Sequence, residues 1–181
     1  SEILNSAFLD VPQPLQAPTQ NIFEKYIYGS SVVPLNLALM IIDDAKSAAR
    51  EKLAQSLGRA LMITYILRDV KDDAKSNHLF IPYELLQQAN VNKTSPMAVV
   101  EDKNLSQARE ALSLEAKKSF NTALRFLNKM NKQSVMPLHY LANLSLYYFN
   151  KMNDRGWEII SPKPNITKFN NIKLIVKTLF A

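Results

Sequence analysis

The amino-acid sequence predicts an all-α protein, and both its composition and the placement of its helix breakers indicate this class. Glycine is scarce, with 3 residues among 181, and the prolines are concentrated at 12–18 and 162–164. Long intervals of the chain are therefore free of residues that interrupt helices. Apolar residues make up 47% of the chain, which is enough for one hydrophobic core at this length. We expect residues 1–181 to form a single helical domain.

The first helix is predicted from Gln20 to Asp43, after an irregular connector at 11–19 that contains three prolines. Residues 1–9 fit either the end of a preceding helix or a loop. Thr19 is suited to cap the start of the helix, and Pro34 is expected to kink it. Because kinked helices are common around large pockets, this helix is a candidate pocket wall.

Local signals place the helices that follow. Pro82 is expected to open a short helix, apolar residues recur about every 3.6 positions in the middle of the chain, and Gly156 is expected to end a long helix. Trp157, just after that glycine, is interpreted as a packing residue. The expected helices lie at 45–75, 82–88, 105–130, 137–154 and 166–180.

The segment 57–86 is the most informative, because it sets two carboxylates four residues apart on an apolar helix. At about 100° per residue, one arc of about 80° contains Met62, Tyr65, Asp69 and Asp73. Burying a carboxylate is costly unless a cation meets it, so an inward Asp-x-x-x-Asp pair predicts a divalent metal. Mg²⁺ prefers such oxygen ligands, with phosphate completing its shell.

The same run of charges is also compatible with an ordinary solvated helix face. Asp72 lies four residues after Arg68, and opposite charges at this spacing pair on exposed helices. Spacing alone leaves both interpretations open. His78 and His139 lack the spacing of metal ligands, so we expect neither a histidine metal site nor a catalytic triad.

The sequence of residues 57–82 resembles the second aspartate-rich motif of the squalene/phytoene synthase family. This motif is commonly written LG-x-A-x-Q-L-T-N-I-L-R-D-V-x-x-D-A, followed by R-x-Y-L-P. Twelve residues match in order: Leu57, Gly58, Ala60, Thr64, Ile66, Leu67, Arg68, Asp69, Val70, Asp73, Ala74 and Pro82. Upstream, Tyr26–Gly29 is similar to the Tyr-Cys-x-x segment that opens a pocket-lining helix in the family. Residues 136–160 and 168–180 resemble its closing helices, so about 3–180 aligns with the C-terminal two-thirds of such an enzyme.

The resemblance implies an isoprenoid-synthase-like helical bundle and a transferase of isoprenoid biosynthesis. Such enzymes condense two prenyl diphosphates with Mg²⁺, giving products such as presqualene diphosphate, squalene or phytoene. The residues it singles out are Asp69 and Asp73 as catalytic, metal-holding groups, and Arg68, Tyr26, Tyr65, Met62 and His78 as substrate-binding groups.

Four positions depart from the family pattern. Met62 replaces a glutamine, Tyr65 an asparagine that helps hold magnesium, His78 an arginine, and Phe80 a tyrosine. Each change removes a polar group from the implied site. We therefore expect weak or no turnover from this chain.

The family's first aspartate-rich motif has no counterpart in this sequence. Asp43 and Asp44 are adjacent, so on a helix they point about 100° apart and do not form a clamp. Two explanations stay open, a fragment of a longer protein or a naturally shortened one. In either case the bundle is expected to be incomplete at its N-terminus.

A second function class therefore stands beside the enzyme. Some members of this fold family have lost activity and serve as assembly factors or structural subunits, including a mitochondrial factor for respiratory complex I. The four positions that depart from the family motif fit such a pseudoenzyme. The retained Arg68, Asp69 and Asp73 instead favour the enzyme lineage. An incomplete bundle would also leave apolar faces exposed, and we expect a protein partner to cover them.

The charge of the chain bears on whether it binds nucleic acid or a membrane. The net charge is +6, but basic and acidic residues are interleaved, so no nucleic-acid partner is expected. The basic surplus lies toward the C-terminal half and favours either peripheral contact with an anionic membrane or solubility alone.

No run of about 18 apolar residues and no signal-peptide pattern occurs, so we expect a cytoplasmic or organellar-matrix protein without a transmembrane segment. With no cysteine, disulfides and thiol catalysis are excluded.

Overall fold

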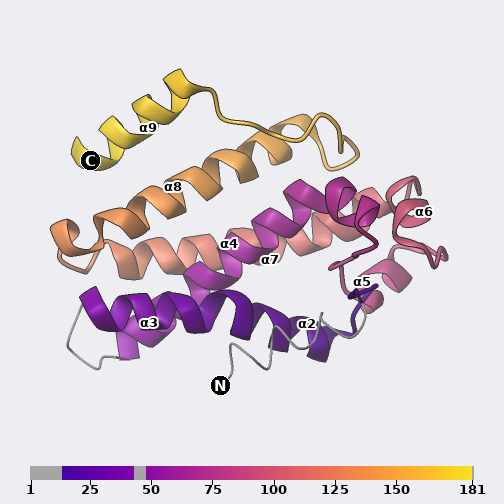
Figure 1. Cartoon of the computed structure of the whole chain (residues 1–181), viewed down its shortest axis with the longest axis horizontal. Coiled ribbons are helices and arrows are strands. Elements are labelled where there is room, and N and C mark those ends of the chain that lie inside the picture. Colours follow the sequence, from indigo (N-terminus) through magenta and orange to yellow (C-terminus); the bar gives the residue numbers. More distant parts are fainter. Residues whose placement is uncertain (1–13, 43–47, 181) are drawn as a thin grey trace.

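The computed structural model describes residues 14–42 and 48–180, and this part of the chain is helical (Figure 1). Its β-structure is a single isolated bridge between Gln16 and Leu79. The all-α class predicted from the sequence is confirmed. The elements are α2 (Gln20–Ile27), the π-helical turn η1 (Tyr28–Val32), α3 (Val33–Ile42), α4 (Ala48–Lys75), α5 (Tyr83–Gln88), α6 (Pro96–Val100), α7 (Leu105–Leu127), α8 (Lys132–Arg155) and α9 (Lys168–Phe180).

The centre of the molecule is the pair of long helices α4 and α7, which pack side by side (Figure 1). In the view of Figure 1, the run α2–η1–α3 lies below this pair, and α8 and α9 lie above it. Side chains from both central helices, among them Leu57, Leu67, Leu112 and Phe120, are almost fully buried. Each such side chain contributes about 1.5 to 3 kcal/mol by leaving water. This core holds in place α4, the helix that carries the aspartate-rich segment.

The run that precedes α4 contains a π-helical turn immediately before Pro34. Proline lacks the N–H that would continue the α-helical bonding, and a π-helical turn lets the helix continue past it. A kink was predicted at Pro34, and the structure has this turn there. Gly58 of α4 lies against the turn, because a Cβ at this position would be 3.0 Å from the Cα of Val32. Ser31 closes the contact by donating its hydroxyl to the Gly58 carbonyl at 2.8 Å.

The start of α8 and the presence of α6 differ from the prediction because capping residues were overlooked. α8 begins at Lys132 rather than at Pro137, since the Asn131 side chain accepts hydrogen bonds from the first backbone N–H groups. The short helix α6 was not predicted; Ser95 caps it and Pro96 occupies its first position. Gly156 ends α8 as expected, with a φ of 93° that favours glycine. Asp43 and Asp44 lie outside the described residues.

The run Gln20–Ile42 is, among the described residues, the one helix long and apolar enough to cross a membrane by length and composition. Phe23, Ile27 and Leu39 of this run are buried against the rest of the chain. Core helices satisfy the same length and hydropathy criterion. The absence of a transmembrane segment therefore stays a prediction.

Candidate functional site

Three carboxylates of the aspartate-rich segment gather at the C-terminal end of α4. Arg68 donates two hydrogen bonds to Asp69, at 3.0 and 2.7 Å. Lys163, from the segment between α8 and α9, places its Nζ 3.2 Å from Asp69 and 2.7 Å from Asp72. Asp72 also pairs with Lys75, so the predicted alternative of an Arg68–Asp72 pair does not form. Lys163 thus ties the acidic end of α4 to a segment more than 90 residues away.

Asp72 and Asp73, adjacent in sequence, are in opposite electrostatic environments. Burial, and next the charge of Asp69, raise the pKa of the Asp73 carboxyl to about 6, with the nearby His78 opposing the shift. The hydrogen bond from Lys163 lowers the pKa of the exposed Asp72 carboxyl. Of these two carboxylates, Asp73 is therefore the one whose ionised form is disfavoured by its surroundings.

Arg68 is held between two aromatic rings. Its guanidinium carbon lies 4.7 Å from the ring centroid of Tyr65 and 4.6 Å from that of Tyr148, which comes from α8. Both distances are in the range of cation–π attraction. The rings and the bidentate pair with Asp69 orient the guanidinium, whose planar fork suits carboxylate and phosphate groups.

A second aromatic group is formed by Tyr26, Phe80 and His78. The Tyr26 ring stacks on Phe80 with centroids 5.0 Å apart, and Phe80 stacks on His78 at 5.5 Å. The Nδ1 atom of His78 is 2.7 Å from the carbonyl of Ser76. Since His78 also acts on the charge of Asp73, the stack is adjacent to the acidic end of α4.

All seven residues predicted for the site are partly buried in the structure, neither in the core nor fully exposed. Met62 and Tyr65 pack against the edge of the hydrophobic core. This intermediate burial is what side chains that line a site require. Their assignment to a site stays a prediction. Tyr148 and Lys163, which contact Arg68 and Asp69, were not singled out for the site.

Arg109 of α7 holds the segment that carries Lys163. Its buried guanidinium donates to the carbonyls of Trp157, Ile159 at 3.5 Å and Leu67 at 3.2 Å, and so joins α7 to α4 and to the end of α8. Burial lowers the pKa of Arg109 to about 10. Trp157 is buried, which confirms its interpretation as a packing residue.

The donor set fits a magnesium ion that is shared with phosphate rather than a site made by protein alone. No group of three or more His, Asp or Glu side chains is placed to hold a metal in the part of the chain that the structure describes. Asp69 and Asp73 supply at most two protein ligands, and Mg²⁺ is often held by one or two carboxylates with phosphate oxygens. Burial, and next the charge of Asp69, raise the pKa of Asp73, and a cation bound there would oppose this shift.

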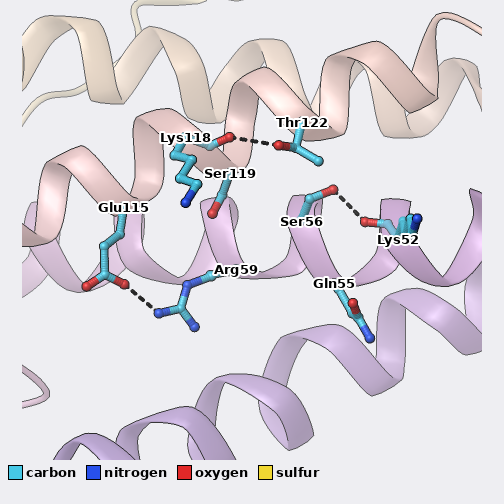
Figure 2. Close-up of a pocket in the computed structure, with 8 residues that line it drawn as sticks. All are labelled: Lys52, Gln55, Ser56, Arg59, Glu115, Lys118, Ser119 and Thr122. Atoms are coloured by element: carbon cyan, nitrogen blue, oxygen red, sulfur yellow. Dashed lines mark hydrogen bonds and ion pairs between the residues drawn. The ribbon is translucent and has the colours of Figure 1, made fainter.

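A cavity of about 460 Å³ lies away from this site, between α4 and α7 (Figure 2). Arg59 contributes to its wall and pairs with Glu24 of α2 and Glu115 of α7. These pairs join three helices, so we interpret Arg59 as a structural residue. None of the seven predicted site residues lines this cavity.

The fold is an all-α bundle of the isoprenoid-synthase type. The family model for squalene/phytoene synthase matches residues 2–170, and the chain belongs to this family. It is 30% identical over 128 residues to a presqualene diphosphate synthase of Sinorhizobium fredii, covering 70% of this chain and 45% of that protein. The presqualene diphosphate synthase of Rhodopseudomonas palustris is 29% identical, with 74% of this chain and 47% of that protein covered.

A solved structure supports the fold. The crystal structure of a dehydrosqualene synthase in complex with ligand superposes with a TM-score of 0.79 at 18% identity, covering 99% of this chain and 62% of that one. The isoprenoid-synthase-like bundle predicted from the sequence is thereby confirmed. The chain spans about half the length of the curated relatives it matches.

Proposed function

We propose that the protein takes part in the magnesium-dependent condensation of two prenyl diphosphates, giving a product of the presqualene diphosphate, squalene or phytoene type. The observation that carries this proposal is the joint placement of Asp69, Asp73, Arg68 and Lys163 at one end of α4. A magnesium diphosphate needs carboxylates for the metal and cations for the phosphate oxygens, and this cluster offers both. Relatives named as presqualene diphosphate synthases support the same reaction class.

Asp69 and Asp73 would hold Mg²⁺, which supplies charge neutralisation to the departing diphosphate. The guanidinium of Arg68 is oriented by its contacts with two aromatic rings, and it would donate paired hydrogen bonds to phosphate oxygens. Lys163, which pairs with Asp69 and Asp72, would exchange one of these carboxylate partners for a phosphate oxygen.

The aromatic side chains would serve the hydrocarbon part of the substrate. Tyr26 and Phe80 present stacked rings beside the acids, and aromatic faces attract the positive charge that develops when an allylic diphosphate ionises. Met62 and Tyr65 would line the pocket and help to exclude water. His78 would meet phosphate more weakly than the arginine it replaces, because a neutral imidazole carries no charge and donates a single hydrogen bond.

A second candidate function is that of a catalytically degenerate family member, an assembly factor or structural subunit. The observation that favours it is that Asp69 already has two cationic partners, Arg68 and Lys163. In this alternative the ion pairs are a permanent structural feature, and Met62 and Tyr65 are packing residues at positions where polar groups were lost. A protein partner would then cover the exposed apolar surface.

Titration calorimetry with Mg²⁺ and a non-reactive thio analogue of farnesyl diphosphate separates the two candidates. We expect magnesium-dependent binding that is lost in the Asp69→Asn/Asp73→Asn double variant. Asp154→Asn, an exposed carboxylate on α8, is the matched control and should bind as the unaltered chain does. If the folded chain binds no analogue with or without magnesium, the proposed site is refuted and the structural role is favoured.

A further inference from the structure

The cavity between α4 and α7 has a polar wall, since all eight of the described residues that line it are polar or charged. Its volume is about 460 Å³, whereas one water molecule takes up about 30 Å³ of the liquid. Figure 2 shows the ion pair of Arg59 with Glu115 at one end of the cavity, and Lys52 and Thr122 at the other. Lys52 and Arg59 are seven residues apart on α4, so the cavity extends about 10 Å along this helix.

Two lysines of this cavity have no carboxylate partner. Lys52 and Lys118 form no ion pair with any residue that the structure describes. On an ordinary helix surface, Glu115 would pair with Lys118, which lies three residues further along α7. It pairs instead with Arg59, which also donates to both carboxylate oxygens of Glu24 on α2. The positive charges of both lysines are therefore left without a counter-charge in this part of the chain.

Three hydroxyl groups line the same cavity. Ser56 donates to the carbonyl of Lys52 at 2.6 Å, and Thr122 donates to the carbonyl of Lys118 at 3.1 Å. Ser119 extends from α7 toward α4 in Figure 2, and its hydroxyl makes no hydrogen bond with a described residue. Because a hydroxyl hydrogen can rotate, all three groups are able to donate to a ligand.

We propose that this cavity binds a small phosphorylated molecule, whose phosphate oxygens meet Lys52 and Lys118 and accept hydrogen bonds from the three hydroxyl groups. Lysine binds phosphate as a point charge, and a charge-assisted hydrogen bond is about twice as strong as a neutral one. A dicarboxylate fits this cavity less well. Its planar groups suit the arginine fork, and the fork of Arg59 is already held by Glu24 and Glu115.

The polar wall favours a hydrophilic ligand over a further helix of the bundle. The solved dehydrosqualene synthase extends beyond this chain, which covers 62% of it. Additional helices of a bundle pack through apolar stripes, and the described lining of this cavity contains no apolar side chain. Covering the unpaired Lys52 and Lys118 with a helix would also bury two uncompensated charges, which is costly.

The cavity is separate from the acidic end of α4. Arg59 lies ten residues before Asp69, which is about 15 Å along the helix axis. None of the seven residues predicted for the magnesium diphosphate site lines the cavity. The proposal therefore holds whether or not the acidic cluster binds magnesium, and its test omits the metal.

Titration calorimetry of the full chain with inorganic diphosphate and with glycerol 3-phosphate tests the proposal, with EDTA present to remove divalent metals. We expect the unaltered chain to bind. Lys52→Gln/Lys118→Gln should weaken this binding by about tenfold or more, because each lysine contributes a charged contact. The matched control carries the same change at two exposed lysines elsewhere, Lys103→Gln/Lys129→Gln, and should bind as the unaltered chain does.

A second variant removes hydroxyl groups without changing the charge. Ser119→Ala/Thr122→Val should weaken binding by about fivefold, while circular dichroism and the thermal melt without ligand stay close to those of the unaltered chain. Ser106→Ala is the control, because its hydroxyl also donates to a carbonyl of a nearby residue but does not line the cavity. It should leave ligand binding unchanged.

The two ligands distinguish the sources of phosphate. Binding of both supports a phosphate ester as the natural ligand, and binding of diphosphate alone supports an inorganic anion in the same cavity. Arg68→Gln/Lys163→Gln should bind diphosphate as the unaltered chain does, since these residues lie outside the cavity. Loss of binding in this variant would assign the ligand to the acidic end of α4 and overturn the proposal.

Three other outcomes would also overturn it. The folded chain binds neither ligand, or the Lys52→Gln/Lys118→Gln variant binds as tightly as its control. Malonate binds as tightly as diphosphate at equal ionic strength, which would assign the cavity to dicarboxylates.

Discussion

Replacing Asp73 by asparagine is expected to stabilise the fold at neutral pH. In the folded chain the pKa of the Asp73 carboxyl is raised from 3.8 to about 6, by burial and by the charge of Asp69. The folded protein therefore holds this proton more tightly than the unfolded chain does. The contribution of this group to stability is largest below about pH 4, declines as the pH rises to about 6, and above that the folded chain bears the full cost of the partly buried charge.

The size of this effect follows from the two pKa values. A tenfold change in proton affinity is worth about 1.4 kcal/mol, so the shift from 3.8 to about 6 corresponds to about 3 kcal/mol. Because the Asp73 side chain is only partly buried, solvent screening reduces the expected gain to about 1 to 2 kcal/mol. Asparagine keeps the size of the side chain and removes its charge.

Urea unfolding at pH 4 and at pH 7.5 measures this prediction, with the slope against denaturant checked for constancy. The Asp73→Asn variant should gain stability at pH 7.5 and little at pH 4. Asp72→Asn is the matched control. Its carboxyl has a lowered pKa because of Lys163, so its removal should not stabilise the fold. Equal stability of Asp73→Asn and the unaltered chain at pH 7.5, or an equal gain for the control, would refute the reasoning.

Two further predictions concern packing around the site. Gly58→Ala should lower the free energy of unfolding by about 1 to 3 kcal/mol in urea titrations, because the added methyl meets the backbone of Val32 at 3.0 Å; unchanged stability would contradict this close approach. Arg109→Met should cost about 3 kcal/mol by the same measurement, since it leaves buried carbonyls without a donor. Arg155→Met, on a less buried arginine that also donates to carbonyls, should cost less, and the reverse order would contradict the assigned role of Arg109.

Much of the fold could be predicted from local sequence signals. Helix periodicity located α4 and α7 to within a few residues, and Gly156 marked the end of α8. These features depend on contacts between residues a few positions apart, which a sequence pattern records directly. The missed start of α8 at Lys132 has the same local origin, since the capping residue Asn131 was present in the sequence but was not used.

Only some residues of the candidate site could be identified from the sequence. Asp69, Asp73 and Arg68 share one helix, so their spacing and the family motif identified them together. Tyr148 and Lys163 come from segments about 80 and more than 90 residues further along, and no spacing rule connects them to α4. The prolines on either side of Lys163 were the available signal, because they mark a rigid segment that can hold a side chain in place.

The sequence by itself determined the helical class, the family and the acidic face of α4, because periodicity and motif spacing are local properties of a chain. Tertiary structure alone decided which cation meets Asp69, how Arg68 is held between rings, and which side of α9 turns outward. An amphipathic pattern locates an apolar stripe but does not say what it faces. In α9 the hydrogen bonds of Asn171 and Thr178 to α8 set that orientation, and these contacts exist only once the helices are packed together.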